Sequence, residues 1–572
     1  MPLFHDAAVP LRAENRLTPV FSENRLTPVF WNGVWKHYPF DQCFGNRGNG
    51  SFQYTGCGPS GGCLMGSAGC QGVRLDYASS DCTGAATESV YPTATEDQDE
   101  DGCYQERGTT QGDYQNWDLE FGCVPEGSGS SINPSTAPNF ILIIADDMGI
   151  GNDAADIYKT YINGFAGRTS EGPNSTPGYE SFLSTGTAFT NAWSSNTCSP
   201  SRSNLLTGQY NFRTGIGAAI GNQDPGLSSE SQTFLEVLGA SGYATGCFGK
   251  WHVSKGAAYG GNEAGQDYER YEHPGLLGCD TYSGYFNGAL SGNSSYDSWQ
   301  KTQNGQDVGV QNTYITQTFV DEATEWANAQ SKPWFMWLAL VAPHTPFHVP
   351  ADAFLEGYDS TVNDASSDQE KLRAMVYSVY RALDMVLANI DPAELENTYV
   401  IFVGDNGPPR ATALPYDDNK VKGSVNNGAI HVPFVISGPG ITARSSNAMA
   451  HFVDMYPTVL DLAGIPVPAD STNIDGISLE PLLTGGTVER DYILSETFGG
   501  MVENRIAVQN GAHKLIYTCG NGQTSFYAIG DEFESSPVES DSTLTNAVLD
   551  LNSAGFAGED YQTVLSNVCS RY

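Results

Sequence analysis

Four continuous apolar segments are the feature that most limits the fold of this chain. The first, residues 139–145 (Asn-Phe-Ile-Leu-Ile-Ile-Ala), has no polar residue in its interior, and residues 334–341, 398–403 and 432–436 resemble it. Short strands without alternation of polar and apolar residues are typical of a parallel sheet that is covered on both faces. The rest of the chain must therefore supply two covering layers.

Helical patterns between these segments can form those layers. Residues 313–329, 368–390 and 454–464 have the apolar spacing of amphipathic helices. Strands that alternate with helices predict an α/β fold with a mostly parallel central sheet flanked by helices. We assign this domain to residues 139–490. After it the segments shorten, with strand patterns at 505–509 and 513–518 and a helical pattern at 543–551, so residues 491–572 are predicted to form a smaller C-terminal α+β subdomain.

Residues 1–138 have a different composition, rich in Gly and Cys, and are predicted to form a disulfide-rich N-terminal extension that ends in a linker. The cysteines of this extension are Cys43, Cys57, Cys63, Cys70, Cys82, Cys103 and Cys123. Asp97, Asp99 and Asp101 alternate before a glycine, as in the first half of a calcium-binding loop. The twelfth position is Gly108 where such a loop has Glu, so a structural Ca²⁺ and a solvated acidic loop are both compatible with the pattern.

Cysteine usage also predicts the compartment. Twelve cysteines are many for a reducing compartment and indicate a periplasmic or secreted protein, although the first residues lack the pattern of a signal peptide. If Cys198 is reserved for chemistry, eleven of the twelve cysteines remain, so at least one of them has no partner within the chain. We predict that Cys247, in an apolar segment, is unpaired and that Cys519 pairs with Cys569.

The charge balance limits the partners. The chain has 27 Lys and Arg against 66 Asp and Glu, a formal net charge of −39, which disfavours binding to nucleic acid or to an anionic membrane. No apolar segment is long enough to span a membrane. An anionic substrate would need cations gathered locally, so basic residues inside motifs are informative.

Polar residues follow two of the predicted strands. Asp146 and Asp147 come directly after residues 139–145, and Asp405 and Asn406 come after residues 398–403. The carboxyl ends of parallel strands share one edge of a sheet. Three carboxylates and an amide at that edge form an oxygen ligand set suited to a hard divalent cation.

The segment from Asn196 to Gly208 resembles a loop that turns into a helix. Pro200 suits the first helical position, and Arg202 then lies in the first turn. Cys198 is placed beside the helix N-terminus, where backbone N–H groups favour an anion or a thiolate.

Four motifs together resemble a known family. Cys-x-Pro-Ser-Arg followed by Leu-Thr-Gly, at residues 198–208, resembles the signature of the formylglycine-dependent (type I) sulfatases of the alkaline phosphatase superfamily. Gly-Lys-Trp-His at 249–252, Ala-Pro-His at 342–344 and the Lys422-Gly423 pair resemble further elements of that family in the same order. The resemblance covers about residues 139–520.

The resemblance implies a role for each matched residue. In the family, a maturation enzyme oxidises the cysteine to formylglycine, whose hydrate attacks sulfur. By resemblance Cys198 is the nucleophile after conversion, Asp405 takes its proton, and Arg202 steadies the hydrate. The implied metal ligands, for Ca²⁺ or equally for Mg²⁺, are Asp146, Asp147, Asp405, Asn406 and Cys198.

The other matched residues handle the sulfate group. By resemblance His252 assists the release of sulfate, Lys250 and Lys422 hold sulfate oxygens, and Lys250 or His344 supplies the proton of the leaving group. One motif departs from the family, which usually has Glu-Gly-Gly-x-Arg-x-Pro after the lysine. Here residues 427–433 are Asn-Gly-Ala-Ile-His-Val-Pro. Glu and Arg are lost together, which suggests a pair replaced as a unit and leaves the placement of Lys422 less determined.

The predicted function is hydrolysis of an aryl or carbohydrate sulfate monoester. Two alternatives remain: a phosphonate monoester or phosphodiester hydrolase of the same superfamily, and an inactive sulfatase-like binding protein. The aromatic-rich residues 257–299 either line the substrate pocket or pack against one another.

Overall fold

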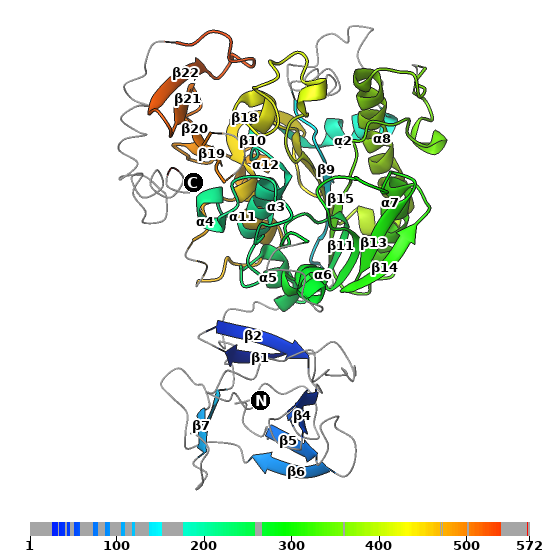
Figure 1. Cartoon of the computed structure of the whole chain (residues 1–572), viewed down its shortest axis with the longest axis vertical. Helices are drawn as coiled ribbons and strands as arrows, with labels where there is room; N and C mark the ends of the chain where they lie inside the picture. The colour runs from blue at the N-terminus through cyan, green and yellow to red at the C-terminus, as the bar shows by residue number, and fades with distance from the viewer. Residues whose placement is uncertain are drawn as a thin grey trace. The chain divides into compact units, whose positions relative to one another are not determined.

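The structure is a computed structural model. It describes residues 136–150, 176–257, 266–358, 361–469, 471, 473–499, 503–538 and 569, together with the backbone of short strands between residues 26 and 120. The chain divides into two compact units, Met1–Ser128 and Gly129–Tyr572 (Figure 1). The predicted calcium ligands Asp97, Asp99 and Asp101 and the seven N-terminal cysteines lie outside the residues whose side chains are described.

The first unit contains three antiparallel sheets with the orders β1-β2, β3-β4-β5-β6 and β7-β8. Their strands are β1 (Leu26–Trp31), β2 (Val34–Pro39), β3 (Cys43–Gly45), β4 (Ser51–Cys57), β5 (Gly72–Tyr77), β6 (Ala86–Tyr91), β7 (Gln105–Gly108) and β8 (Trp117–Glu120).

A ten-stranded sheet forms the centre of the second unit, in the order β14-β13-β12-β11-β15-β9-β16-β17-β10-β18. Its strands are β9 (Asn139–Ala145), β10 (Thr187–Trp193), β11 (Ala244–Lys250), β12 (Thr281–Tyr285), β13 (Trp299–Gln303), β14 (Gln306–Gln311), β15 (Trp334–Ala339), β16 (Thr398–Gly404), β17 (Phe434–Ser437) and β18 (Arg444–His451). The five neighbours β12, β11, β15, β9 and β16 are parallel, whereas β17 runs antiparallel to β16. This confirms the predicted mostly parallel sheet.

Helices cover both faces of this sheet (Figure 1). They are α2 (Pro177–Thr185), α3 (Cys198–Thr207), α4 (Asn211–Thr214), α5 (Phe234–Ala240), α6 (Gln266–Leu276), α7 (Ile315–Asn328), α8 (Asp368–Asn389), α9 (Pro392–Leu395), α10 (Asn427–Ile430), α11 (Met455–Leu462) and α12 (Glu480–Leu483), with short 3-10 helices at Asp352–Phe354, Arg410–Thr412 and Phe452–Asp454.

The alternation of side chains along β9 explains why two layers are needed. Ile141 and Ile143 pack into a core cluster with residues of α2, α7 and α8. Phe140, Leu142 and Ile144, on the opposite face, pack with residues of α3, α5 and α11. Since successive strand residues point to opposite faces, a strand that is apolar throughout is stable only between two helical layers.

A four-stranded antiparallel sheet follows, in the order β19-β20-β21-β22. Its strands are β19 (Ile493–Thr497), β20 (Arg505–Gln509), β21 (His513–Thr518) and β22 (Gln523–Ala528). The strands predicted at 505–509 and 513–518 are confirmed, and the helix predicted at 543–551 lies outside the described residues. The domain limits 1–138, 139–490 and 491–572 stay a prediction.

The disulfides correct one prediction and confirm another. Cys519 pairs with Cys569, as predicted. The prediction that Cys247 is unpaired is wrong, because it forms a disulfide with Cys279 across a Cα–Cα distance of 5.8 Å. The physical reason is strand pairing: Cys247 lies in β11, and Cys279 comes just before β12, the adjacent parallel strand. Among the described residues, the free cysteine is Cys198, and it is buried.

Within the described part of the chain, no helix combines the length and the apolar composition that crossing a membrane requires.

Candidate active site

The pairing of β9 with β16 brings the acidic residues together. Gly404 is the register partner of Ala145, so Asp405 and Asp146 are the first residues beyond two adjacent parallel strands. The Asp405 N–H donates to the Ala145 carbonyl at 2.9 Å, and the Asp147 N–H donates to Asp405 Oδ1 at 3.0 Å. Asp147 has a φ of 67°, an uncommon backbone conformation that turns this N–H toward Asp405.

Three buried oxygens of this cluster have no hydrogen-bond partner: Asp146 Oδ1, Asp147 Oδ2 and Asn406 Oδ1. The Asn406 amide is fixed because its Nδ2 donates to Asp147 Oδ1 at 2.7 Å and to the Gly407 carbonyl at 2.8 Å. A buried polar atom without a partner is costly, and three such oxygens in one place match the ligand preference of a hard divalent cation. Ligand atoms of Asp146, Asp147 and His344 lie within 4.8 Å of one another. The cluster therefore fits a metal ion.

Asp405 differs from Asp146 and Asp147 because both of its oxygens have partners, Oδ1 the Asp147 N–H and Oδ2 Arg202. Arg202, which is fully buried, donates to Asp405 Oδ2 from Nη2 at 2.9 Å and from Nε at 3.2 Å. Its Nη1 donates to the Lys250 carbonyl at 2.6 Å. Burial and the charge of Asp146 raise the pKa of Asp405 to about 7, although Arg202 opposes the shift.

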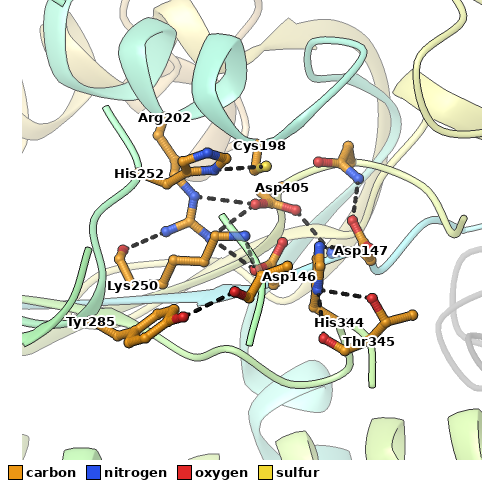
Figure 2. A network of polar contacts seen from close by, with 12 residues as sticks. Asp146, Asp147, Cys198, Arg202, Lys250, His252, Tyr285, His344, Thr345 and Asp405 are labelled. Atoms are coloured by element: carbon orange, nitrogen blue, oxygen red, sulfur yellow. Dashed lines mark hydrogen bonds and ion pairs between the residues drawn. The ribbon is translucent and has the colours of Figure 1, made fainter. Parts of the chain in front are cut away.

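Helix α3 brings Cys198 to the same place (Figure 2). The helix begins at Cys198 itself, two residues before the start that Pro200 predicted. Cys198 Sγ lies 3.1 Å from His252 Nδ1, and His252 Nε2 lies 3.1 Å from the Ile220 carbonyl. Because a carbonyl only accepts, Nε2 carries the proton and Nδ1 accepts from the thiol.

The environment keeps both members of this pair neutral. Burial, followed by the charge of Lys250, holds the pKa of His252 well below its ordinary value. Burial also raises the pKa of the Cys198 thiol, although Lys250 and Lys422 oppose the shift. A neutral buried thiol is a weak nucleophile, so Cys198 in its unmodified form is not activated as a thiolate.

Two lysines contact the metal-site carboxylates. Lys250 Nζ forms an ion pair with Asp146 Oδ2, and Lys422 Nζ forms one with Asp147 Oδ1. The position of the Lys250 backbone requires a glycine at residue 249. Gly249 has a φ of +103°, and a Cβ atom there would lie 1.9 Å from the Ala339 carbonyl oxygen. Burial lowers the pKa of Lys422, but Asp147 together with the other acidic groups nearby raises the pKa above its ordinary value.

His344 lies on the far side of Asp147, with its Nε2 3.6 Å from Asp147 Oδ2. Its Nδ1 bonds to the Thr345 carbonyl at 2.9 Å, so Nδ1 carries the proton of the neutral ring. Burial lowers the pKa of His344 despite the neighbouring carboxylate. The residues that the motifs selected for the catalytic centre therefore lie together at one edge of the sheet. Figure 2 labels most of them, and the contacts of Lys422 and Asn406 with Asp147 place those two residues beside the others.

The sequence did not indicate the residues that support the segment carrying Lys422. Lys514 and Glu534, both 1% exposed, form an ion pair of 2.6 Å. Lys514 Nζ donates to Asn427 Oδ1 at 2.9 Å, and the Asn427 N–H donates to Glu534 Oε1 at 3.2 Å. His431 Nδ1 contacts Glu532 Oε2 at 2.8 Å. Asn427 and His431 stand where the family has Glu and Arg, so the C-terminal segment supplies the charges that this loop lacks.

Most aromatic residues of the 257–299 segment pack inside the protein. Those with buried side chains are Tyr282, Tyr285, Phe286, Tyr296 and Trp299. Two of them fix the backbone of the site: Tyr282 donates to the Gly249 carbonyl at 3.2 Å and Tyr296 to the His344 carbonyl at 2.7 Å. For these five residues the packing interpretation holds.

Comparison with known proteins gives consistent results. A sulfatase family model matches residues 138–465, more than half of the chain. An uncharacterized sulfatase of Escherichia coli, YdeN, is 28% identical over 378 residues, which are 60% of this chain and 66% of that protein. Human arylsulfatase A is 28% identical over 418 residues, which are 68% of this chain and 76% of that protein.

A solved structure shows the same fold. The crystal structure of Ps i-CgsB in complex with k-i-k-neocarrahexaose matches with a TM-score of 0.59 at 21% identity, covering 76% of this chain and 98% of that one. At this identity the likeness concerns the fold, whereas the family model matches the sequence that carries the site. The chain therefore belongs to the sulfatases, the sulfuric ester hydrolases of the alkaline phosphatase superfamily.

Proposed function

We propose that this protein hydrolyses sulfate monoesters with Cys198, converted to formylglycine by a maturation enzyme, as its nucleophile. The observation that carries the proposal is the position of Cys198. It is buried at the first residue of α3, with Sγ 3.1 Å from His252 Nδ1, in the cluster that holds Asp405 and Arg202 (Figure 2). Conversion supplies an oxygen nucleophile at a position where the thiol itself is held neutral.

A divalent cation belongs to the proposed centre. Asp146, Asp147 and Asn406 would hold it through their three unpaired oxygens, and Asp405 and Cys198 remain proposed ligands by resemblance. Ca²⁺ is the ion that the resemblance implies, and the same oxygens suit Mg²⁺. When bound, the ion supplies positive charge that polarises the reacting oxygens.

Proton transfer from the nucleophile is assigned to Asp405. Its carboxylate is oriented by Arg202 and by the Asp147 N–H, so it is held in one position from which it can accept a proton. Arg202 holds Asp405 and the Lys250 carbonyl at the same time, so it fixes the base relative to the strand that carries Lys250.

Lys250 and Lys422 are assigned to the sulfate oxygens, where fixed positive charge stabilises the transition state. Two residues are candidates for protonating the leaving group. Neutral His344 has its proton on Nδ1, engaged with Thr345, whereas the Lys250 ammonium carries three protons. Lys250 is therefore the assigned donor. The hydrate oxygen at position 198 forms a bond to sulfur as the ester S–O bond breaks and the leaving oxygen takes the Lys250 proton. The proton that Asp405 takes from the nucleophile balances the one that Lys250 gives. Over the cycle one water is consumed and an alcohol and sulfate are released.

Two coarser properties complete the proposal. The Cys247–Cys279 and Cys519–Cys569 disulfides support a periplasmic or secreted location. The substrate is an aryl or a carbohydrate sulfate.

The test compares one sequence in two states. The protein is expressed with and without the maturation enzyme, and the Cys198 peptide is analysed by mass spectrometry. We expect only the converted protein to hydrolyse 4-nitrophenyl sulfate, while both have the same thermal midpoint. Cys198→Ala should match the unconverted protein.

Each alternative predicts a different result. Faster turnover of a phosphonate monoester or a phosphodiester than of any sulfate would identify the related hydrolase. Unconverted Cys198 after co-expression would favour the binding protein. Undiminished sulfate ester turnover by Cys198→Ala would refute the proposal.

A further inference from the structure

A cavity of about 170 Å³ opens beside Lys422 and is lined by residues from two parts of the chain. Arg410, Asp418 and Lys422 come from the segment after β16, and Thr497, Glu503 and Arg505 come from the ends of β19 and β20. The cavity adjoins the catalytic centre because Lys422 Nζ contacts Asp147, and the Gly423 N–H donates to the Asn196 carbonyl, two residues before Cys198, at 2.8 Å.

Charged and polar residues and one glycine line the cavity. Besides these six residues the lining consists of an asparagine, a glycine and a serine, so within the described part of the chain no aliphatic or aromatic side chain faces the cavity. Pockets that bind flat apolar ligands are lined mainly by apolar and aromatic groups. The side chains that line this cavity therefore suit a polar group better than the ring system of a steroid or a large aryl ester.

Two guanidinium groups at this cavity have unused capacity to bind an anion. Among the described residues Arg505 has a single ion pair, with Glu503 at 3.5 Å, and both side chains are 36% exposed. Its Nε is buried without a hydrogen-bond partner, as is Thr497 Oγ1. Arg410 is exposed and has no ion pair with any described residue. Lys422, in contrast, is already paired with Asp147.

The positions of these arginines are informative because cations are scarce. The chain has 27 Lys and Arg against 66 Asp and Glu, and three of the 27 line this one cavity. The acids of the lining are Glu503, paired with Arg505, and Asp418. Guanidinium groups bind carboxylates, and tetrahedral oxyanions such as phosphate and sulfate, through paired N–H donors.

We propose that this cavity binds the part of the substrate next to the scissile ester, and that the substrate is a saccharide sulfate with a second acidic group. Arg410 and Arg505 bind that second group, either a sulfate or a carboxylate, and the Asp418 carboxylate accepts hydrogen bonds from sugar hydroxyls. This inference rests on the proposed sulfatase function, because it assigns the neighbouring part of the same substrate.

The test uses converted enzyme and four substrates. They are a neutral monosaccharide monosulfate, the same sugar with a second sulfate, a disaccharide with a uronic acid beside the sulfated sugar, and an aryl sulfate. We expect kcat/KM for at least one of the two doubly acidic sugars to exceed that for the neutral sugar about tenfold or more, the factor that one charge-assisted contact provides. The better of the two identifies the second group as sulfate or carboxylate.

Charge variants assign the effect to the cavity. Arg410→Gln combined with Arg505→Gln should lower kcat/KM about tenfold for the preferred doubly acidic sugar, through KM, and change it less than about twofold for the neutral sugar. Asp418→Ala removes the proposed acceptor for the sugar hydroxyls and should raise KM for all three sugar sulfates, but not for the aryl sulfate. Arg381→Gln, which removes a cation from α8, is the matched control and should leave all four rates unchanged.

The possible failures are distinguishable. If converted wild-type enzyme hydrolyses none of the four sulfates, the proposed function fails. If it hydrolyses the neutral sugar or the aryl sulfate as well as the doubly acidic sugars, or if the arginine variant loses the same factor on every substrate with an unchanged thermal midpoint, only the present inference is overturned.

Discussion

Lys514→Met is the substitution whose cost follows most directly from the structure. Lys514 and Glu534 are each 1% exposed and lie 2.6 Å apart, and Lys514 Nζ also donates to Asn427 Oδ1 and lies 4.7 Å from the centre of the Trp193 ring. Methionine fills a similar volume but leaves the Glu534 carboxylate buried without its cation. Breaking a buried ion pair in this way costs about 3–5 kcal/mol.

A second variant separates the charge effect from packing. Lys514→Met combined with Glu534→Gln removes both charges. The amide oxygen of the introduced glutamine can still accept from the Asn427 N–H, which Glu534 Oε1 accepts at 3.2 Å. Asn426 Nδ2, which donates to Glu534 Oε2, loses this acceptor. We expect this double variant to lose only about 1–2 kcal/mol, the cost of the remaining lost hydrogen bonds. The double variant should therefore be more stable than Lys514→Met alone.

The assay is urea unfolding followed by tryptophan fluorescence, with Lys371→Met on the surface of α8 as the control. Sulfatase activity provides a second measurement. Because Asn427 lies in the loop after Lys422, kcat/KM of the converted enzyme should fall further in Lys514→Met than in the double variant. If Lys514→Met costs less than about 1 kcal/mol, or if the two substitutions are simply additive, the ion pair does not support this loop and the reasoning is wrong.

Three further predictions concern other parts of the protein. A chelator should lower the thermal midpoint of the wild-type protein, and Ca²⁺ should restore it. The Asp147→Asn variant should respond to neither addition. If wild type and variant respond equally, the proposed metal site is wrong. Burial raises the pKa of Glu496 to about 8 from an ordinary value of about 4.3. Between these values the folded protein keeps the proton and the unfolded chain loses it, so the free energy of unfolding should fall by about 1.4 kcal/mol for each unit that the pH rises. Glu496→Gln should therefore be the more stable protein at pH 8 and lose that advantage toward pH 4, and a difference independent of pH would contradict this. The Cys247–Cys279 bridge spans 32 residues, so replacing both cysteines by Ala should cost about 4 kcal/mol in urea unfolding, and a loss under about 1 kcal/mol would show that it contributes little.

The central sheet could be predicted because its signal is local. Residues 139–145 are apolar throughout, and such a strand has few alternatives to a position between two layers. The acids at 146 and 405 could be placed together because parallel strands end at the same edge. The first inference uses neighbouring residues alone. The second adds only the general rule that parallel strands end at the same edge of a sheet.

The failures have the opposite cause. The partner of Cys247 depends on which strand lies beside β11, and the sequence alone does not state that β12 does. The Lys514–Glu534 ion pair likewise joins β21 and the chain after β22 to Asn427, the first residue of α10, which lies about 90 residues earlier than Lys514. The only local sign of this ion pair that we used was the absence of the family's Glu and Arg from residues 427–433. That absence indicated that a pair had been replaced, but not which residues had replaced it.

The charges of the candidate catalytic centre give a reason why the proposed metal ion and the cations belong together. Three acids, Asp146, Asp147 and Asp405, face the three cations Arg202, Lys250 and Lys422, so with all six ionised the centre is neutral. A neutral centre in a chain with a net charge of −39 would not attract an anion, because the surrounding potential is negative. A divalent cation at the unpaired oxygens would make the centre positive by two charges. The acidic composition of the protein thus makes the sulfate affinity of this site depend on the ion as well as on the lysines.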